Sequence, residues 1–198
     1  MDISSLWPLM VFTLAATITP GGATTLATAS GANFGFRNSI PLMLGIATGL
    51  ASMAAAAAFG LANALLINPL LPLAMKVAGT LYLLWLAWKV AVAPAPGTEI
   101  KAVRPIGYIS GLWMLWHNPK GWAMTAAASA AYTNIASGPT QLAVAMALSF
   151  GLAALASLSI WCFAGRELAQ RINDPRHWRI VNGSLGALIV ASTAPMWL

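Results

Sequence analysis

Charge is what this sequence has least of, because only 7% of its 198 residues are charged. Ordinary soluble domains carry roughly 25% charged residues. In place of charge, 59% of the chain is hydrophobic. This composition excludes an ordinary soluble domain and predicts an integral membrane protein.

Cysteine and histidine are almost absent too. The single cysteine, Cys162, excludes an intrachain disulfide, and only two histidines are present. An enzyme acting within the membrane needs a cluster of acid–base groups or metal ligands, and these residues are too few to build one. We therefore expect no enzymatic activity, no metal site and no cofactor.

What the sequence has instead is a series of long apolar stretches. Each reaches the roughly 20 residues that a helix needs to cross the hydrocarbon core of a bilayer. The start, MDISS, lacks the basic residues of a cleaved signal, so we expect the first stretch to be retained. Gly45 and Gly49 favour close helix packing, more within the protein than between copies. The sequence predicts an all-α protein with six transmembrane helices at approximately 6–29, 39–66, 70–92, 106–131, 140–164 and 178–197.

Basic residues fall in alternate links between these stretches. They lie after the first stretch, around the link between the third and fourth, and after the fifth: Arg37; Lys89, Lys101 and Arg104; Arg166, Arg171, Arg176 and Arg179. Because links rich in Lys and Arg stay in the cytoplasm, we place these three links inside and both termini outside. The net charge of +6 is thus a topology signal and no sign of nucleic-acid binding.

Two prolines interrupt the first and fourth stretches at equivalent places. Pro20 and Pro119 lie 99 positions apart, half the length of the chain, within Thr19-Pro20-Gly21-Gly22 and Asn118-Pro119-Lys120-Gly121. Three spans per half invert the second half relative to the first, and paired breaks in inverted halves indicate a transporter's binding site. We therefore expect a first three-helix repeat at 1–93, a cytoplasmic linker at 94–105 and a second repeat at 106–198.

The local chemistry of these breaks suits an anion. Each proline lacks an N–H group, which leaves the carbonyls of Ala16 and Leu115 without helical partners. Thr19 and Asn118 precede the prolines as helix caps, so each break should begin a half-helix whose free N–H groups attract negative charge. Lys120, near the middle of the fourth stretch, adds a full positive charge. Simple kinks, with hydroxyl groups bonding the freed carbonyls, stay open as the alternative.

The candidate substrate-binding residues surround both breaks: Thr19, Pro20, Gly21, Gly22, Thr24, Asn118, Pro119 and Lys120. The four acidic residues all lie at or outside the ends of the apolar stretches: Asp2, Glu99, Glu167 and Asp174. A cationic side chain on a substrate would therefore find no counter-ion in the membrane. The predicted substrate is neutral or zwitterionic.

Coupling to protons would need a titrating group other than a carboxylate. His117 adjoins the second break, and imidazole is the side chain that changes charge near neutral pH. Lys120 is the second candidate for proton exchange. In the alternative interpretation, His117 donates to a carbonyl or lies beside Trp116 near the interface.

Four segments resemble the LysE/RhtB family of amino-acid exporters. They are ITPGGATTLATASGANFGFRNSIPLMLGIATG at 18–49, KVAGTLYLLWLAWKV at 76–90, WHNPKGW at 116–122 and NGSLGALIV at 182–190. The resemblance extends over nearly the whole chain, and its most specific part is Thr-Pro-Gly in the first stretch together with Asn-Pro-Lys in the fourth. It implies a six-helix inner-membrane protein of two related halves that uses the proton gradient to export amino acids or similar small metabolites. Five residues match motif positions of the family: Pro20, Gly21, Asn118, Pro119 and Lys120.

The first motif departs from the family after Thr-Pro-Gly. Family members usually continue Thr-Pro-Gly with a second proline and then Asn or Asp, whereas this chain has Gly22, Ala23 and Thr24. The resemblance therefore does not specify the substrate. Export of another small solute or of a cation, and a structural or lipid-interacting role in the bilayer, stay open as alternatives. A homodimer stays open as well.

Overall fold

The computed structural model describes residues 3–60, 70–93, 105–172 and 174–194. Within these ranges every regular element is a helix, which confirms the all-α prediction for them. In chain order the elements are α1 (Ile3–Ile18), α2 (Gly22–Ala58), α4 (Leu70–Ala91), α5 (Tyr108–Trp116), α6 (Pro119–Ala131), the 3-10 helix η1 (Thr133–Ile135), α7 (Pro139–Arg171) and α8 (Pro175–Ala191).

The two proline breaks are interruptions between helices. The first apolar stretch is divided between α1 and the start of α2, and the fourth is divided between α5 and α6. α2 continues through the predicted link after residue 29 and bends at Gly35, whose φ of 74° is in the left-handed region that glycine tolerates. The Ser39 hydroxyl lies 2.8 Å from the Gly35 carbonyl oxygen and 2.7 Å from the Ser30 hydroxyl oxygen, and these contacts hold the bend.

Two helices of the described ranges, α2 and α7, are each long and apolar enough to cross a membrane. α1 and α4 contain shorter apolar segments, Leu6–Ile18 and Thr80–Ala91. α5 and α6 have 9 and 13 residues, so neither spans a bilayer alone. Helices fit for a membrane are thus present, while the count of six spans stays a prediction.

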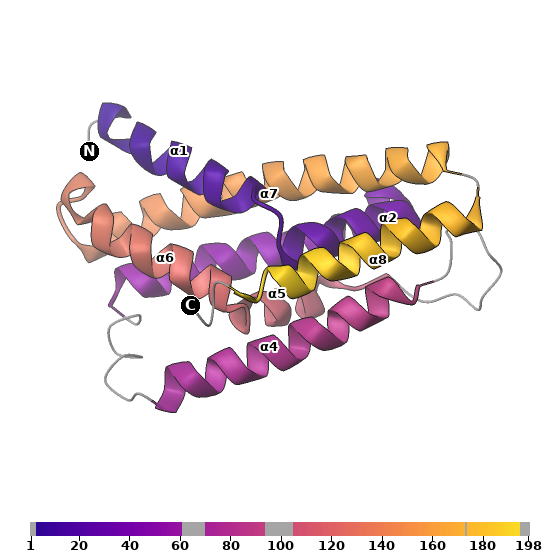
Figure 1. Ribbon diagram of the computed structural model, residues 1–198. Helices are drawn as coiled ribbons and strands as arrows, with labels where there is room; N and C mark the ends of the chain where they lie inside the picture. Colours follow the sequence, from indigo (N-terminus) through magenta and orange to yellow (C-terminus); the bar gives the residue numbers. More distant parts are fainter. Residues whose placement is uncertain (1–2, 61–69, 94–104, 173, 195–198) are drawn as a thin grey trace.

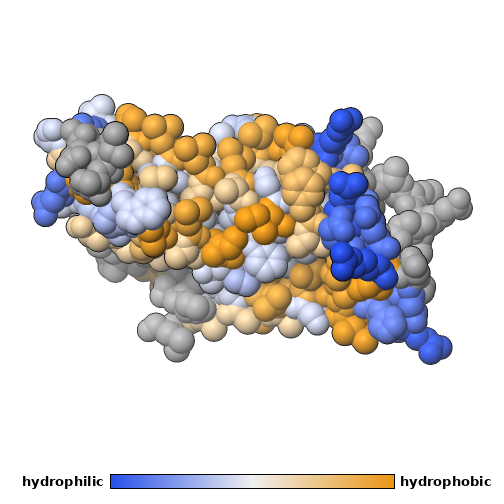
Figure 2. Space-filling model, turned by 90° about the horizontal axis from the view of Figure 1, so that it is seen from above, coloured by the Kyte–Doolittle hydropathy of each residue, from blue (hydrophilic) through white to orange (hydrophobic). Residues whose placement is uncertain are grey.

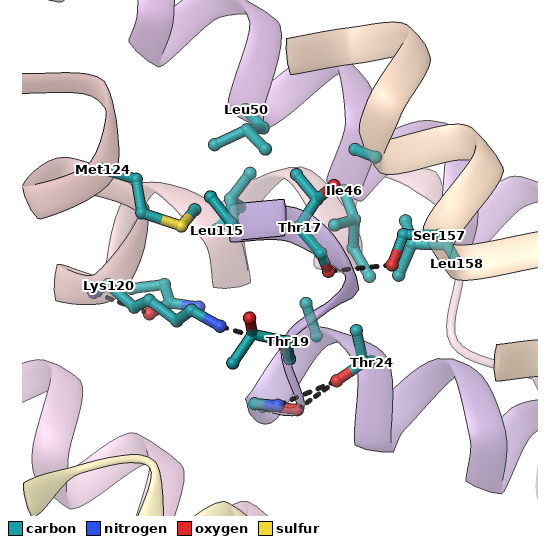
Figure 3. Close-up of a pocket in the computed structure, with 17 residues that line it drawn as sticks. Thr17, Thr19, Thr24, Ile46, Leu50, Leu115, Lys120, Met124, Ser157 and Leu158 are labelled. Carbon is teal, nitrogen blue, oxygen red and sulfur yellow. Dashed lines mark hydrogen bonds between the residues drawn. The ribbon is translucent and has the colours of Figure 1, made fainter. Parts of the chain in front are cut away.

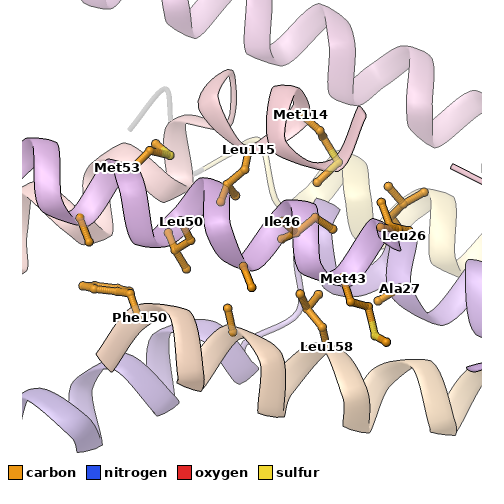
Figure 4. Packing of buried hydrophobic residues seen from close by; sticks show 14 of the residues in the cluster. Leu26, Ala27, Met43, Ile46, Leu50, Met53, Met114, Leu115, Phe150 and Leu158 are labelled. Atoms are coloured by element: carbon orange, nitrogen blue, oxygen red, sulfur yellow. The ribbon is translucent and has the colours of Figure 1, made fainter. Parts of the chain in front are cut away.

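α2 and α7 form the centre of the bundle and pack along each other (Figure 4). Ile46, Leu50 and Met53 of α2 are almost wholly buried, as are Phe150 and Leu158 of α7. α1 packs on α7, α5 packs on α2, and α4 and α8 pack on each other (Figure 1). The core therefore lies between the two longest helices, and both broken segments are anchored to it.

Glycines bring α2 and α5 into close contact. A Cβ atom on Gly45 would meet the backbone carbonyl of Tyr108, and a Cβ atom on Gly111 would lie 2.6 Å from the Leu42 carbonyl oxygen. A Cβ atom on Gly49 would also meet α5, because it would lie 3.3 Å from a backbone oxygen of that helix. The two helices can approach this closely only because these positions lack side chains. The predicted internal packing of Gly45 and Gly49 is confirmed.

The surface has an apolar girdle and a strongly polar end. Figure 2 shows hydrophobic side chains along the bundle and hydrophilic side chains gathered at the end where α7 finishes and α8 begins. The ends of α4 and α7, the bend of α2 and the start of α8 carry exposed basic residues: Arg37, Lys89, Arg166, Arg171, Arg176 and Arg179. An apolar girdle beside a basic end suits a protein set in a bilayer.

Candidate functional site

The carboxyl-terminal end of α1 is held by side chains of α7 (Figure 3). The Ser157 hydroxyl donates to the Thr17 carbonyl at 2.8 Å. The Trp161 indole N–H donates to the Ile18 carbonyl at 3.1 Å. Because a helix end leaves its last carbonyls without helical partners, these two bonds supply partners that the broken helix lacks.

The next carbonyl along the chain, that of Thr19, accepts a hydrogen bond from a cationic side chain in the second half of the protein. The ammonium group of Lys120, on α6, donates to the Thr19 carbonyl at 3.0 Å. The carboxyl-terminal end of a helix carries partial negative charge, which favours a cation there. Lys120 also lies beside the start of α2, because a Cβ atom on Gly21 would be 3.4 Å from its Nζ atom. The lysine thus connects the two breaks.

α2 begins two residues later than predicted, at Gly22, and is capped differently. The Thr19 hydroxyl bonds back to the Ala15 carbonyl at 2.7 Å, so the prediction of Thr19 as the cap is wrong. Gly21, in an extended conformation, is the cap residue, and its N–H donates to the Thr24 hydroxyl at 2.8 Å. The hydroxyl of Thr19 takes the nearer acceptor in the preceding helical turn, which removes it from the start of α2.

The first turn of α2 keeps free backbone donors. The hydrogen bonds of the described residues use none of the N–H groups of Gly22, Ala23 and Thr24. These groups lie at the positive end of a helix. The Thr24 hydroxyl donates to the Gly21 carbonyl at 2.9 Å, so it belongs to the cap. The backbone of α2, more than any hydroxyl, is suited to accept an anion.

The second break is capped as predicted but offers fewer free donors. The Asn118 side-chain oxygen accepts from the Lys120 N–H at 3.0 Å, and Pro119 takes the first helical position. The Gly121 N–H donates to the Asn118 carbonyl at 3.0 Å. The Leu115 carbonyl has no helical partner, because that position is Pro119, and it accepts the Asn118 N–H at 2.8 Å instead, since the chain tightens into a turn there. The first three residues of α6 therefore add no unbonded N–H group.

Both breaks face one pocket of about 430 Å³, a volume that includes space open to the outside (Figure 3). Six of the eight predicted site residues line it: Thr19, Gly21, Gly22, Thr24, Asn118 and Lys120. Pro20 and Pro119 are not among the lining residues, and their contribution is to interrupt the helices. The rest of the wall is largely apolar, with Ile46, Leu50, Leu115, Met124 and Leu158.

Two polar residues of this wall, Thr17 and Ser157, are not among the predicted site residues. Ser157 stands as a hydroxyl within the fifth apolar stretch, which is a weak signal for a buried hydrogen bond. Its partner Thr17 is 140 positions away, so the pairing depends on how α1 lies against α7. Neither of the described acidic residues lines the pocket. Glu167 and Asp174 are exposed, and they lie 3.8 Å from Arg171 and 3.6 Å from His177, respectively.

His117 lies apart from the break pocket. It lines a different hollow, formed by α4 and α5 with Ala78, Tyr82, Trp113 and Met114. Its Nδ1 atom is 2.9 Å from the Trp113 carbonyl oxygen, and its ring centroid is 4.3 Å from that of Trp113. The geometry matches the alternative in which His117 bonds a carbonyl, with Trp113 as the neighbouring ring in place of Trp116.

The departure from the family motif at Gly22 has a packing counterpart. A Cβ atom at this position would lie 2.6 Å from the Cδ2 atom of Leu83 on α4. Leu83 is only 3% exposed, so its side chain has little room to move away. A proline at position 22 would carry the same Cβ atom. In this packing, a side chain at position 22 would therefore crowd Leu83.

The chain matches a protein-family model and several curated proteins. The family model described as LysE type translocator matches residues 14–193. The chain is 33% identical over 111 residues to a cysteine/O-acetylserine efflux protein of Salmonella typhi, covering 54% of this chain and 53% of that protein. It is 31% identical over 121 residues to the protein of the same name from Escherichia coli strain K12, covering 60% of this chain and 58% of the relative. The aligned regions thus span little more than half of these relatives.

No solved structure matches the chain. The match to the family model, in contrast, includes both breaks and every residue that lines the pocket. On this ground, the chain belongs to the LysE type translocator family.

Proposed function

We propose that this chain is a secondary transporter that exports amino acids or similar small zwitterionic metabolites across the inner membrane. The observation that carries the proposal is the pocket between the two helix breaks, which combines the Lys120 ammonium group with the free N–H groups of α2. Family membership supports it, and so do the relatives named as cysteine/O-acetylserine efflux proteins. Cysteine and O-acetylserine are therefore the first substrates to test.

The proposal includes six spans in two inverted repeats, at 1–93 and 106–198, joined by a cytoplasmic linker at 94–105. The packing of the described helices supports it, because α1 lies on α7 as α5 lies on α2, and α4 pairs with α8. These are the contacts that a two-fold relation between the halves requires. The basic end of the bundle supports a cytoplasmic side there, which leaves both termini periplasmic.

In the proposed complex, the substrate carboxylate lies between the first turn of α2 and the ammonium group of Lys120. A helix start and a lysine are both suited to an anion. The apolar wall then receives a small uncharged side chain. Neither Glu167 nor Asp174, the acidic residues within the described ranges, lines the pocket, so a dibasic amino acid would leave its second cation unpaired at high cost.

We further propose that export is coupled to protons and that Lys120 is the better candidate for the exchange. Lys120 lines the break pocket, so a bound substrate contacts it directly. His117 faces a different hollow and its Nδ1 atom is already 2.9 Å from a backbone carbonyl.

Substrate flux in proteoliposomes tests the proposal. The purified chain should move O-acetyl-L-serine or L-cysteine faster than lysine or glutamate, and Lys120→Ala should lower this flux at least about tenfold, since a hydrogen bond to a charged group contributes roughly 1.5–3 kcal/mol. Lys89→Ala is the matched control, because Lys89 is an exposed lysine over the Trp85 ring outside the pocket. A clear preference for lysine, equal flux in both variants, or no flux from folded protein would contradict the proposal.

A further inference from the structure

Three successive carbonyls lie at the end of α1, those of Thr17, Ile18 and Thr19, and each accepts a hydrogen bond from a distant part of the chain. Ser157 bonds the first, Trp161 the second, and Lys120 the third, at 2.8, 3.1 and 3.0 Å. Two of these donors are uncharged groups of α7. The third is a full cation that reaches across 101 positions of sequence. The end of α1 is therefore a place where the protein holds an ammonium group of its own.

We infer that this place is an ammonium-binding subsite, which Lys120 fills when the pocket is empty and which the amino group of the substrate fills during transport. The inference rests on the proposed function, because it assumes that a zwitterion enters the break pocket. Its new element is an exchange of two cations at the Thr19 carbonyl. The carboxylate of the substrate draws the Lys120 ammonium group toward the start of α2, and the amino group replaces it at the end of α1.

The geometry allows this exchange with a small movement. Nζ of Lys120 is 3.0 Å from the Thr19 carbonyl oxygen, and it would be 3.4 Å from a Cβ atom on Gly21. The cation thus already lies next to the cap of α2, whose first N–H groups are free. Lysine has four rotatable carbon–carbon bonds in its stem, so its head can shift while its backbone stays in α6.

The charges explain why a zwitterion suits the exchange better than other ligands. An anion alone would draw Lys120 away and leave the negative end of α1 without a cation. A cation alone would have to displace Lys120 with no carboxylate to receive it. An amino acid supplies both charges on adjacent carbon atoms. The subsite therefore selects for a free primary amino group beside a carboxylate.

Two isomers test this selection on the unaltered protein. O-acetyl-L-serine has a free ammonium group, whereas N-acetyl-L-serine has the same atoms and carboxylate with its nitrogen acylated. Binding of each to the full chain in detergent is measured by the rise in its unfolding temperature. We expect the O-acetyl isomer to bind at least about tenfold more tightly, as a lost hydrogen bond to a charged group predicts. Equal binding of the two isomers would overturn the inference.

A second measurement uses ethylammonium chloride as a cation without a carboxylate. In Lys120→Met the stem is retained and the subsite is vacant, so ethylammonium should raise the unfolding temperature of this variant at concentrations about tenfold lower than for the unaltered protein. Lys89→Met is the control, and sodium chloride at the same concentration corrects for ionic strength. If all three proteins respond alike, the subsite is refuted.

The two proposals fail in different ways. If ethylammonium stabilises Lys120→Met as expected while the unaltered protein transports no amino acid, the ammonium-binding place is supported and the exporter is refuted. If the unaltered protein transports amino acids, but binds both isomers equally and ethylammonium does not preferentially stabilise Lys120→Met, the subsite alone is refuted. Where Lys120→Met does not fold, the comparison of isomers on the unaltered protein still decides.

Discussion

Lys120 and Thr19 are 101 positions apart in the sequence, yet the ammonium group of the first lies 3.0 Å from the carbonyl oxygen of the second. This bond joins the start of one half-helix to the end of another. It forms where both helices are interrupted, because a helix end leaves its last carbonyls without helical partners. Changes at either break should therefore affect both stability and transport.

Ser157→Ala should destabilise the protein by about 1–3 kcal/mol, because it leaves the buried Thr17 carbonyl without its donor. Unfolding in detergent measures this loss. Ser129→Ala is the matched control, since Ser129 makes a similar bond of 3.0 Å to the Ala57 carbonyl outside the pocket. We expect both variants to lose stability and only Ser157→Ala to lose flux. If both variants change flux equally, Ser157 has no specific role in the substrate site.

Gly22→Ala should destabilise the protein by about 1–3 kcal/mol through crowding against Leu83. Leu83→Ala alone should also destabilise it, by about 2–5 kcal/mol, because it leaves a cavity. The double variant should lose less than the two single losses combined, since the new methyl group enters the space that Leu83 leaves. Additive losses in a thermal-unfolding cycle would show that the two positions do not share that space.

Gly165→Ala should disrupt the contact between α7 and α2. A Cβ atom on Gly165 would meet the backbone carbonyl of Thr28, which cannot rotate away as a side chain does. We expect a loss of about 3 kcal/mol, at the upper end of the range for overpacking. Gly183→Ala, on α8, places its methyl group in open space and should be neutral or stabilising by up to about 1 kcal/mol. Similar unfolding temperatures for the two variants would contradict this packing.

His117→Gln should keep both transport and its dependence on pH. The reason is that His117 lines the hollow between α4 and α5, and its ring lies against Trp113 outside the break pocket. Flux in proteoliposomes over a series of pH values tests this expectation. A variant that transports at a rate independent of pH would instead make His117 the coupling residue.

Local chemistry predicted the second break more fully than the first. Asn118 followed by Pro119 is a cap and a first helical position, and α6 begins there. Thr19 followed by Pro20 has the same pattern, yet the hydroxyl of Thr19 bonds the preceding turn and Gly21 becomes the cap. A polar side chain before a proline can either cap the next helix, as Asn118 does, or bond a carbonyl of the preceding turn, as Thr19 does. The residue types alone do not distinguish these two outcomes.

Apolar composition and missing proline N–H groups act over a few residues, so the sequence alone predicted a helical protein that suits a membrane and is interrupted at Pro20 and Pro119. Which donors meet which carbonyls depends instead on how the helices pack. Ser157 reaches Thr17 and Lys120 reaches Thr19 only once α1, α6 and α7 have packed together. The packing of the helices also placed His117 in a hollow other than the break pocket and the Leu83 side chain against Gly22. These relationships depend on distances between helices, which local sequence does not encode.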